Sequence, residues 1–404
     1  MKKKLLWVKT DAMLPLDKGG KIRSFNMLKQ ICDKASVDYL CFASAGLNRT
    51  DCELLTGMFH AFWEVLPADP DRKDWKYLLR FILAHALGKP FTLFNYHRKH
   101  MAQKIHELCR QNAYDAVVCD FLMPALNFPP ALRKGAVLFQ HNVEHLLWER
   151  QAQQEKRYLR KQVYTREYRL VKRFEEVLCR EFRRVVCVSE EDAAVLRHRF
   201  GLDHVFSIDT GVDVEYFVPS DNPPVKQRVV FTGSMDWLPN IDAMRWFVRE
   251  VFPKVQESFP EAELAIVGRN PAPEIQRLAE GNSKIIVSGS VPDVRPWMAQ
   301  AEVFVVPIRV GGGTRLKIYE AMAMGLPIVS TTIGAEGLKY AHGDNILIVD
   351  TVDDFAGSVV ELLRDQARRT SMGLAARRFV LENFAWPRIA HQFLEIALNS
   401  ERSL

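Results

Sequence analysis

The residues best suited to chemistry lie between 311 and 330, where the sequence reads GGGTRLKIYEAMAMGLPIVS. A glycine loop, 311–313, precedes a predicted helix that carries Arg315 and Lys317 in its first turn. Cations are disfavoured at the positive end of a helix dipole by about 0.3–1 kcal/mol each, so we expect an anion to offset them. Exposed backbone N–H groups, the dipole and two cations together suit a diphosphate. The glycines alone would equally suit a turn before a solvated helix end.

Glu320 follows Lys317 by three residues, which places both side chains on one face of the predicted helix. A carboxylate just beyond the cations can accept hydrogen bonds from the hydroxyl groups of a ribose or another sugar. The apolar run Leu326–Ser330 behind the helix predicts a short buried strand. The stretch therefore predicts a site for a diphosphate that is attached to a hydroxyl-bearing group.

Short apolar runs alternate with helical patterns along the chain, which predicts parallel strands joined by crossover helices. The first series comprises Leu5–Val8, Val37–Ala43, Phe62–Leu66, Ala116–Cys119, Val137–Phe139 and Val185–Val188. The second series comprises Arg228–Phe231, Glu263–Val267, Lys284–Val287, Val303–Val306, Pro327–Ser330 and Ile346–Val349. We therefore predict an α/β protein with two Rossmann-like parallel sheets in tandem.

Prolines mark the break between the two series. The stretch 213–228 contains three prolines before a new strand begins, and we place the linker near Pro219. The predicted domains are residues 1–215 and 216–382, and the C-terminal helices, about 383–404, are expected to cross back to the first domain.

Composition is typical of a globular protein. The chain has 404 residues, of which 48% are hydrophobic and 26% charged, and its formal net charge is +6. This mildly basic balance suits anionic ligands but does not select nucleic acid. All seven cysteines lie in the first half, without a CxxC pair or a Cys/His metal spacing. That pattern predicts reduced thiols and a cytoplasmic protein without a metal site.

Basic residues are concentrated between Arg150 and Arg184, where twelve Lys or Arg and five Glu give a net charge of +7. We predict one helical segment, and two interpretations fit it. It rests on anionic lipid headgroups at the inner face of the cell membrane, or it is a solvated helix with a buried apolar stripe. The stripe residues would be Tyr158, Val163, Tyr164, Leu170, Val171, Phe174, Val177 and Leu178.

A second apolar stretch, Tyr77–Phe94, is interrupted by Arg80, His85, Lys89 and Pro90, so it cannot span a bilayer. Core packing and an acceptor-side surface for a lipid-linked glycan both fit this stretch. The run Leu5–Val8 near the N-terminus is too short for a signal peptide and predicts a first strand. Any membrane association is therefore expected to be peripheral.

Five motifs occur in order in the second half: FTGSMDWLPN (231–240), IVGRNP (266–271), VSGSVPDVRPW (287–297), VPIRVGGGTRLKIYEAMAMGLPIVST (306–331) and GAEGL (334–338). With them the chain resembles the retaining glycosyltransferases of family 4 (group 1), over nearly its whole length. The likeness is greatest to bacterial exopolysaccharide-type sugar transferases, including those of PEP-CTERM/EpsH-like systems. It implies the GT-B fold, in which two Rossmann-like domains face each other across a cleft.

The resemblance assigns roles to the residues of the second half. Glu320 resembles the glutamate that binds the donor ribose, and Arg315 and Lys317 resemble the cations on the donor diphosphate. The catalytic residues it implies are His141, Arg315 and Lys317. The donor-binding residues it implies are Gly19, Gly20, Gly233, Ser234, Gly289, Val291, Gly311, Gly312, Gly313, Thr314 and Glu320.

In the first half, the glycines after strand one resemble a flexible loop that closes on the donor, and Arg23 follows in the next helix. His141, at the end of an apolar strand in LFQHNVEH, matches a histidine near the donor sugar. Glu144 and His145 are further candidates. We expect His141 to position the sugar or polarise a hydroxyl group rather than to act as a base.

The sequence departs from the family pattern at three places. The family pattern has two glutamates eight residues apart, and Glu320 matches the second. Gly312 stands at the position of the first, so the usual acceptor for the sugar hydroxyls is missing. The phosphate turn is replaced by residues 233–236, which lack its Arg and Lys. The linker motif is changed to DTGVD at 209–213.

The resemblance implies metal-independent transfer, with retention, of a sugar from a nucleotide-diphosphate sugar to a glycan or lipid-linked acceptor in polysaccharide biosynthesis. The nucleotide sugar is a substrate, and no cofactor or nucleic-acid partner is expected. One rival is a metal-dependent transferase that uses the D-x-D of Asp69 and Asp71. Another is a protein that binds anionic membranes or nucleic acid and keeps a degenerate sugar site.

Overall fold

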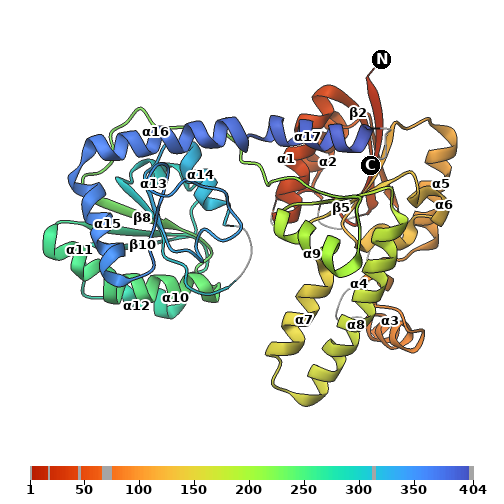
Figure 1. Ribbon diagram of the computed structural model, residues 1–404, viewed down its shortest axis with the longest axis horizontal. Helices are drawn as coiled ribbons and strands as arrows, with labels where there is room; N and C mark the ends of the chain where they lie inside the picture. Colours follow the sequence, from red (N-terminus) through yellow and green to blue (C-terminus); the bar gives the residue numbers. More distant parts are fainter. Residues whose placement is uncertain (1, 17–18, 44–46, 66–74, 312–314, 400–404) are drawn as a thin grey trace. The chain divides into compact units, whose positions relative to one another are not determined.

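The computed structural model describes residues 2–16, 19–43, 47–65, 75–311 and 315–399. The chain forms two compact units: unit 1 consists of residues 1–210 with 387–404, and unit 2 of residues 211–386. Each unit is built on one parallel sheet with helices packed against it (Figure 1). The chain passes from one unit to the other at 210–211 and at 386–387. The boundaries predicted from the sequence were 215–216 and about 382–383, within about five residues of these positions.

Unit 1 contains a seven-stranded sheet of order β3-β2-β1-β4-β5-β6-β7. Its elements are β1 (Lys3–Val8), α1 (Gly19–Lys34), β2 (Ala35–Phe42), α2 (Arg49–Met58), β3 (Ala61–Val65), α3 (Trp75–Ala86), α4 (Phe91–Phe94), α5 (Lys99–Gln111), β4 (Ala116–Asp120), the 3-10 helix η1 (Met123–Asn127), α6 (Pro130–Arg133), β5 (Val137–Gln140), α7 (Glu144–Gln154), α8 (Tyr158–Glu181), β6 (Arg184–Cys187), α9 (Glu190–Phe200), β7 (Val205–Ser207) and, from the C-terminal end, α17 (Trp386–Leu398).

Unit 2 contains a six-stranded sheet of order β10-β9-β8-β11-β12-β13. Its elements are β8 (Arg228–Thr232), α10 (Leu238–Trp246), the π-helix η2 (Phe247–Val251), α11 (Phe252–Ser258), β9 (Glu263–Val267), α12 (Pro273–Leu278), β10 (Ile285–Gly289), α13 (Arg295–Ala299), β11 (Val303–Val306), α14 (Lys317–Ala323), β12 (Ile328–Ser330), β13 (Leu347–Ile348), α15 (Val352–Arg364) and α16 (Gln366–Asn383).

All twelve predicted strands are present, with ends that differ by at most two residues, and the prediction of two parallel sheets is confirmed. The pairing is parallel throughout: Leu5 of β1, for example, lies opposite Val37 of β2 and Ala116 of β4. The strand β7 (Val205–Ser207) was not predicted, because three residues give too short a pattern to recognise. Parallel pairing places the carboxyl ends of all strands of a unit at one edge of its sheet, where ligands bind in such folds.

Helix boundaries follow from local capping chemistry. The helix α9 begins after Ser189, whose hydroxyl accepts the N–H of Asp192, and ends at Gly201, which has φ +63°. Three acidic residues in its first turn and two arginines in its last turn suit the helix dipole. The helix α15 starts similarly at Thr351.

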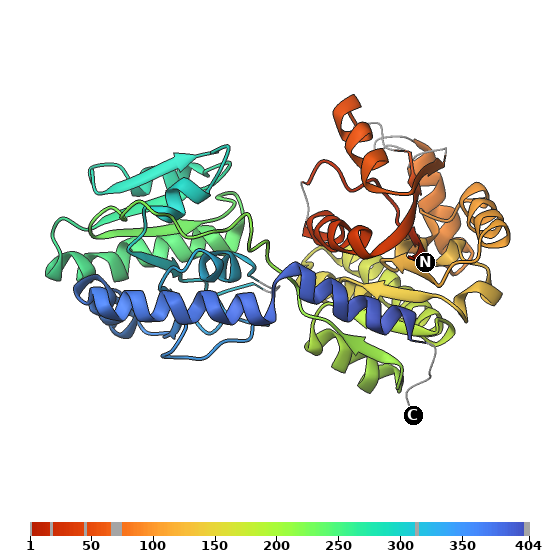
Figure 2. The same cartoon turned by 90° about the horizontal axis from the view of Figure 1, so that it is seen from above.

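The C-terminal helix α17 returns to unit 1 and completes its core. Phe393 packs against Trp7 of β1 and Phe139 of β5, with ring centroids 5.2 and 5.1 Å apart. Figure 2 shows α17 in dark blue along unit 1. The ring contacts explain why the last helix remains with the first half of the chain.

The basic segment between Arg150 and Arg184 forms two helices instead of the predicted one. α7 and α8 are joined by the turn 155–157 and pack as a hairpin. The predicted buried stripe is also wrong at three residues: Tyr158 is 72% exposed, Val163 38% and Val177 47%. A helical hairpin buries the side facing its partner, and that side of α8 carries Glu167, Val171, Glu175, Leu178 and Cys179.

All seven cysteines are free thiols; Cys41, Cys119, Cys179 and Cys187 are buried and the others are partly buried. Burial raises the pKa of the buried thiols well above its ordinary value. Across the described ranges, no helix combines the length and the apolar character needed to cross a membrane.

Candidate functional site

Lys317 lies where the strand order of unit 2 reverses. β8 and β11 are neighbours in the sheet although β9 and β10 separate them in the sequence, and open α/β sheets bind ligands beside such a point. Lys317 follows β11, but its Nζ donates to the carbonyl of Thr232 at the end of β8 and lies 3.5 Å from Asn240 Oδ1. The ammonium is therefore held at the carboxyl edge of the sheet.

The charges of Lys317 and Glu320 are both destabilised by burial. Burial, together with Arg315, lowers the pKa of Lys317 to about 7, and burial raises the pKa of Glu320 to about 7 although Lys317 opposes that shift. In the part of the chain described here, the half-buried Glu320 carboxylate accepts no hydrogen bond. A bound anion would stabilise the charged form of Lys317. Beside it, the Glu320 carboxylate can accept hydrogen bonds from hydroxyl groups of a ligand.

Two glycines bring the ends of β8 and β9 together beside Lys317. A Cβ on Gly268 would lie 1.6 Å from the carbonyl oxygen of Gly233, and Gly268 has φ +155°. A Cβ on Gly233 would lie 2.7 Å from Lys317 Nζ. The absence of side chains here lets the two strand ends and Lys317 approach one another closely. The next residue, Ser234, uses its hydroxyl to donate to Asp236 Oδ1 at 2.6 Å.

Arg315 lies before the helix and not in its first turn, because α14 begins at Lys317 and has seven residues. Its side chain is 5% exposed, and its guanidinium carbon lies 5.1 Å from the centroid of the Trp237 ring. A Cβ on Gly311 would meet the ring of Pro239 at 2.7 Å, with φ +94° at this glycine. The predicted loop residues Gly312, Gly313 and Thr314 lie outside the described residues.

Two of the predicted donor-binding residues, Gly289 and Val291, lie farther along the same edge of the sheet. Gly289 ends β10 with φ +69°, and Val291 is partly buried against the unit 2 core. β10 is separated from β8 by β9. The structure thus brings Gly233, Lys317 and the Thr232 carbonyl into contact, and it places Gly289 two strands away.

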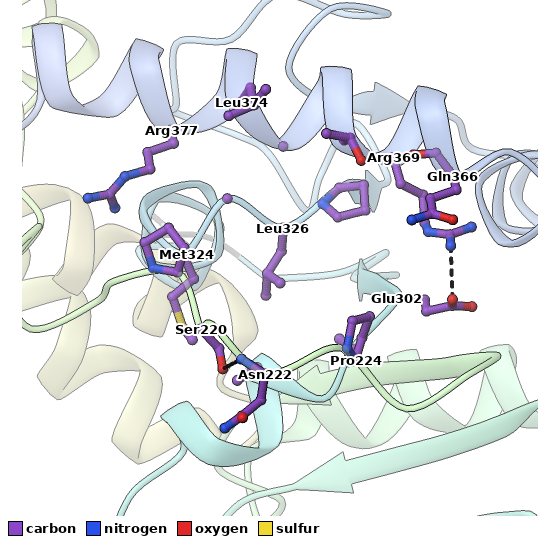
Figure 3. A pocket seen from close by; sticks show the side chains of 17 residues that line it. Ser220, Asn222, Pro224, Glu302, Met324, Leu326, Gln366, Arg369, Leu374 and Arg377 are labelled. Atoms are coloured by element: carbon purple, nitrogen blue, oxygen red, sulfur yellow. Dashed lines mark hydrogen bonds and ion pairs between the residues drawn. The ribbon is translucent and has the colours of Figure 1, made fainter.

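A cavity of about 340 Å³ opens at the opposite edge of unit 2 (Figure 3). It lies between the segment 219–224, the residues that precede β11 and β12, and α16. Its arginines already have structural partners: Arg369 pairs with Glu302 at 2.9 Å, and Arg377 donates to the carbonyl of Ala323. Because it lies at the amino ends of the strands, this cavity is distinct from the site around Lys317.

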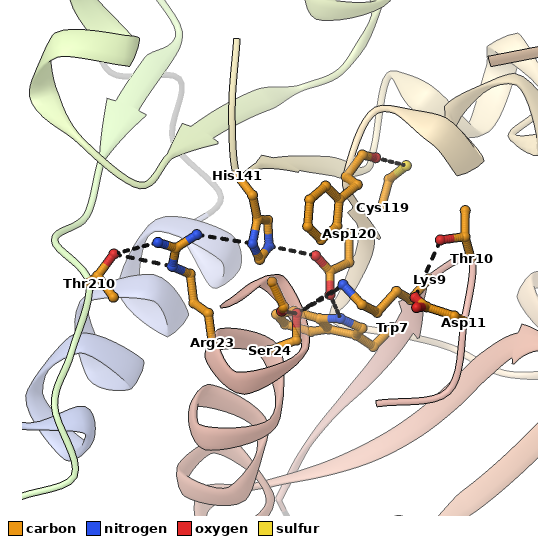
Figure 4. Close-up of polar contacts among 12 residues, drawn as sticks. Trp7, Lys9, Thr10, Asp11, Arg23, Ser24, Cys119, Asp120, His141 and Thr210 are labelled. Carbon is orange, nitrogen blue, oxygen red and sulfur yellow. Dashed lines mark hydrogen bonds and ion pairs between the residues drawn. The ribbon is translucent and has the colours of Figure 1, made fainter. Parts of the chain in front are cut away.

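Unit 1 has its own polar cluster where its strand order reverses, between β1 and β4. Asp120, at the end of β4, is fully buried. Its Oδ2 accepts from Trp7 Nε1 at 2.9 Å, Lys9 Nζ at 3.1 Å and Ser24 Oγ at 2.7 Å, and its Oδ1 lies 2.7 Å from His141 Nε2 (Figure 4). We call these five residues the Asp120 cluster.

Sequence reasoning missed the Asp120 cluster apart from His141. A signal was present, because Lys9 and Asp120 directly follow predicted strands and His141 comes two residues after one. Parallel strands deliver such residues to one edge of the sheet. Burial by itself raises the pKa of Asp120, but Lys9, His141 and the hydrogen bonds outweigh burial and hold that pKa well below its usual range.

The contacts of His141 fix its protonation state. Arg23 Nη1 lies 3.2 Å from His141 Nδ1, and a guanidinium can only donate, so Nδ1 accepts and Nε2 carries the proton toward Asp120. Burial chiefly lowers the pKa of His141 to about 3, with Lys9 and Arg23 adding to the shift and Asp120 opposing it. The other nitrogens of Arg23 donate to Thr210 Oγ1, at the end of unit 1.

Phe121 covers His141 and explains the neighbouring glycine. The two rings stack with centroids 3.8 Å apart, and Phe121 has φ +74°, which is rare for a bulky residue and clusters at functional sites. A Cβ on Gly20 would lie 2.5 Å from Phe121 Cζ. Gly19 and Gly20 were predicted to lie in a loop, but they form the first turn of α1. The close approach to Phe121 favours glycine at position 20.

His145 and Glu144 belong to a second buried cluster, around Glu175 of α8. The Glu175 carboxylate accepts the backbone N–H groups of Glu144 and His145 at 2.9 and 3.0 Å and lies 2.6 Å from His145 Nδ1. It thus caps the start of α7. Burial, with Glu175 adding to it, raises the pKa of Glu144 to about 8.

We expect the free energy of unfolding to decrease as the pH falls from about 6.5, the pKa of an unfolded histidine, toward about 3. The folded chain keeps His141 neutral while the unfolded chain takes up a proton, so this contribution is complete above about pH 6.5 and is lost below it. Urea unfolding between about pH 7 and pH 4 measures it. In His141→Gln, which keeps a hydrogen-bond donor and an acceptor, the pH slope should fall by about one proton. Equal slopes in wild type and His141→Gln would contradict the assignment.

The described residues contain no group of three His, Cys, Asp or Glu placed to hold a metal ion. The alternative D-x-D motif, Asp69 to Asp71, lies outside the described residues.

Two family models match the chain in succession. Residues 55–216 match the model of Glycosyltransferase Family 4, and residues 226–365 match that of Glycosyl transferases group 1. The second match contains Gly233, Lys317 and Glu320, and the first contains Asp120 and His141. Together the two matches support a glycosyltransferase of family 4, group 1.

Curated relatives resemble parts of the chain. A GDP-mannose-dependent monoacylated alpha-(1-6)-phosphatidylinositol monomannoside mannosyltransferase of Corynebacterium glutamicum is 26% identical over 53% of this chain and 62% of its own length. A GDP-mannose-dependent alpha-(1-6)-phosphatidylinositol monomannoside mannosyltransferase of Mycolicibacterium smegmatis is 28% identical over 44% of this chain and 51% of its own. An uncharacterized protein in the cps region of Klebsiella pneumoniae is 27% identical over 39% of this chain and 42% of its own length. The matched segments thus span about half the length of these relatives.

Solved structures match the whole fold. A glycosyltransferase from Rickettsia africae has a TM-score of 0.66 at 14% identity and covers 98% of both chains. The Anabaena protein Alr3699/HepE, in complex with UDP and glucose, has a TM-score of 0.61 at 15% identity over 97% of this chain and 98% of its own. These similarities and the two parallel sheets confirm the predicted GT-B fold.

Proposed function

We propose that this chain transfers a sugar from a nucleotide-diphosphate sugar to a hydroxyl group of a glycan or lipid-linked acceptor. The observation that carries the proposal is the Lys317 ammonium at the strand-order reversal of unit 2, beside the bare backbone of Gly233. Relatives that use GDP-mannose and a related fold in complex with UDP and glucose support the same substrate class. In this proposal unit 2 holds the donor, and unit 1 serves the acceptor.

Stabilisation of the leaving group would account for most of the rate acceleration. Negative charge grows on the nucleoside diphosphate as the bond to the sugar breaks, and a fixed cation interacts most strongly with the transition state. Lys317 and Arg315 supply that charge, and the Glu320 carboxylate accepts hydrogen bonds from the ribose hydroxyls. We further propose that the reaction needs no metal ion and retains the anomeric configuration, as the family resemblance implies.

His141 has a positioning role in this proposal. Both of its ring nitrogens are engaged, one with Asp120 and one with Arg23, so it has no vacant acceptor for a substrate proton. Its buried ring lies directly after β5, at the carboxyl edge of the unit 1 sheet. A base role would require Arg23 to leave Nδ1.

The proposed setting is polysaccharide biosynthesis at the inner face of the cell membrane, where the enzyme binds peripherally. The basic residues of the α7–α8 hairpin support this location, because cations near a bilayer are attracted to anionic headgroups.

A panel of nucleoside diphosphates and nucleotide sugars should raise the melting temperature of the purified chain for one base above the others. A ligand at about 100 times its Kd stabilises the folded state by about 2.7 kcal/mol, a shift that is readily measured. Lys317→Met should abolish the shift, and Lys284→Met, which changes a partly exposed lysine directly before β10 that pairs with Glu261, should preserve it. No shift with any nucleotide sugar would refute the proposal.

A further inference from the structure

The outer face of α3 exposes a continuous apolar stripe. Positions separated by three, four, seven and eight residues fall on one side of a helix. Single exposed apolar side chains are ordinary, but a contiguous set marks a surface that meets an apolar partner. The stripe consists of Trp75 (69% exposed), Leu78 (61%), Leu79 (52%), Ile82 (55%) and Leu83 (46%), and Leu87 (55%) continues it beyond the helix.

The inner face of α3 is firmly packed, so the direction of the stripe is fixed. Tyr77 and Phe81 contact Phe91, with ring centroids 4.9 and 5.2 Å apart. His85 lies 3.2 Å from the Glu167 carboxylate of α8, and the same carboxylate accepts the backbone N–H of Phe91 at 3.1 Å. Because these contacts occupy one side of α3, the exposed side chains point away from the core of unit 1.

A second exposed apolar pair lies at the turn between α7 and α8. Tyr158 is 72% exposed and Leu159 is 78% exposed. Four exposed cations flank the pair: Lys156, Arg157, Arg160 and Lys161. The turn segment 156–161 contains no acidic residue. Figure 1 shows that α3 and the α7–α8 hairpin extend from the same end of unit 1, below β5.

The charged residues along α3 and α4 are basic: from Trp75 to Phe94 the sequence contains three Lys or Arg and no Asp or Glu. The turn 156–161 adds four exposed cations. Exposed apolar side chains beside lysine and arginine are the pattern of helices that lie in the plane of a bilayer interface.

We propose that the outer face of α3 and the turn 156–161 dock unit 1 on an anionic lipid bilayer. The stripe enters the interfacial region of the bilayer, and the surrounding cations contact the headgroups. This surface lies on unit 1 and does not include the residues around Lys317, so the proposal stands independently of sugar transfer. It assigns the membrane contact to an apolar helix face as well as to the basic hairpin.

The test is co-sedimentation of the full chain with lipid vesicles. We expect binding to phosphatidylcholine vesicles that contain about 30% phosphatidylglycerol, weaker binding in high salt, and little binding to phosphatidylcholine alone. The double variant Leu78→Ser/Ile82→Ser should lower the partition coefficient by about tenfold or more, since it removes two inserted side chains. Lys156→Glu/Arg160→Glu should remove most of the preference for anionic lipid. The matched control Leu374→Ser/Leu381→Ser changes two exposed leucines of α16, 62% and 40% exposed, and should bind like wild type.

Circular dichroism and the melting temperature of each variant establish that it is folded. The proposal is overturned if the wild-type chain ignores anionic vesicles, or if the α3 variant binds them as tightly as wild type. Light scattering distinguishes membrane binding from binding of a second copy of the chain. If the α3 variant loses self-association while vesicle binding is unchanged, the stripe is a protein interface and not a membrane surface.

Discussion

Replacing Lys317 with methionine is expected to lower kcat/KM for sugar transfer by about 10²- to 10³-fold, the usual effect of removing one group that stabilises transition-state charge. Methionine keeps the length of the side chain and removes a buried charge whose pKa is already lowered to about 7, so the fold should survive. The measurement is the initial rate of transfer, or of donor hydrolysis, with the nucleotide sugar found by the thermal-shift panel.

Two further measurements separate a catalytic effect of Lys317 from a structural one. Lys284→Met should retain the wild-type kcat/KM. The wild-type kcat/KM should also decline as the pH rises above about 7, because only the ammonium form of Lys317 attracts the diphosphate. The kcat/KM of Lys317→Met should not show this decline. A folded Lys317→Met protein with an unchanged kcat/KM would show that the site is assigned to the wrong residue.

Replacing Asp120 with alanine is expected to lower the free energy of unfolding by about 3–5 kcal/mol, because the change leaves the ammonium of Lys9 buried without its charge partner. Trp7, Ser24 and His141 lose their acceptor at the same time. Urea unfolding at neutral pH measures the difference. Asp120→Asn, which keeps one acceptor oxygen, should fall between wild type and Asp120→Ala.

Asp115→Ala is the matched control for Asp120. Asp115 directly precedes the same strand and pairs with Lys3 at 2.8 Å, but the pair is solvent-exposed and should contribute less than about 1 kcal/mol. If Asp120→Ala and Asp115→Ala are equally mild, the Asp120 cluster does not hold unit 1 together. In that case the conformation of Phe121 and the protonation of His141 would need another explanation.

The Asp120 cluster of unit 1 and the Lys317 site of unit 2 place charged groups at equivalent points of the two sheets. In unit 1 a carboxylate accepts from Lys9 after β1 and Ser24 of α1 and lies beside the residue after β5, and in unit 2 a lysine at the start of α14 donates to the carbonyl at the end of β8. Both lie where strand order reverses. Parallel strands end at one edge, and the outward connections on either side of the reversal leave space there for a ligand.

The strands could be read from the sequence because their signal is local. Runs such as Glu263–Val267 and Val303–Val306 are apolar on both faces, as strands covered by helices on both sides must be. The glycine, arginine and lysine motif near Lys317 was recognisable for the same reason. Helix hairpins were less accessible, because the turn 155–157 contains neither glycine nor proline to mark it.

The sequence by itself determined the α/β class, the two series of parallel strands and the residue types of the donor motif, since each depends on neighbours within a few positions. Only the tertiary structure decided which groups meet: Lys317 with the Thr232 carbonyl, or Asp120 with Trp7 and His141. It also decided that the apolar side chains of α3 face outward, where the sequence allowed a buried helix. A local pattern states which side of an element is apolar, whereas burial and pKa depend on what packs against that side, and those partners come from distant parts of the chain.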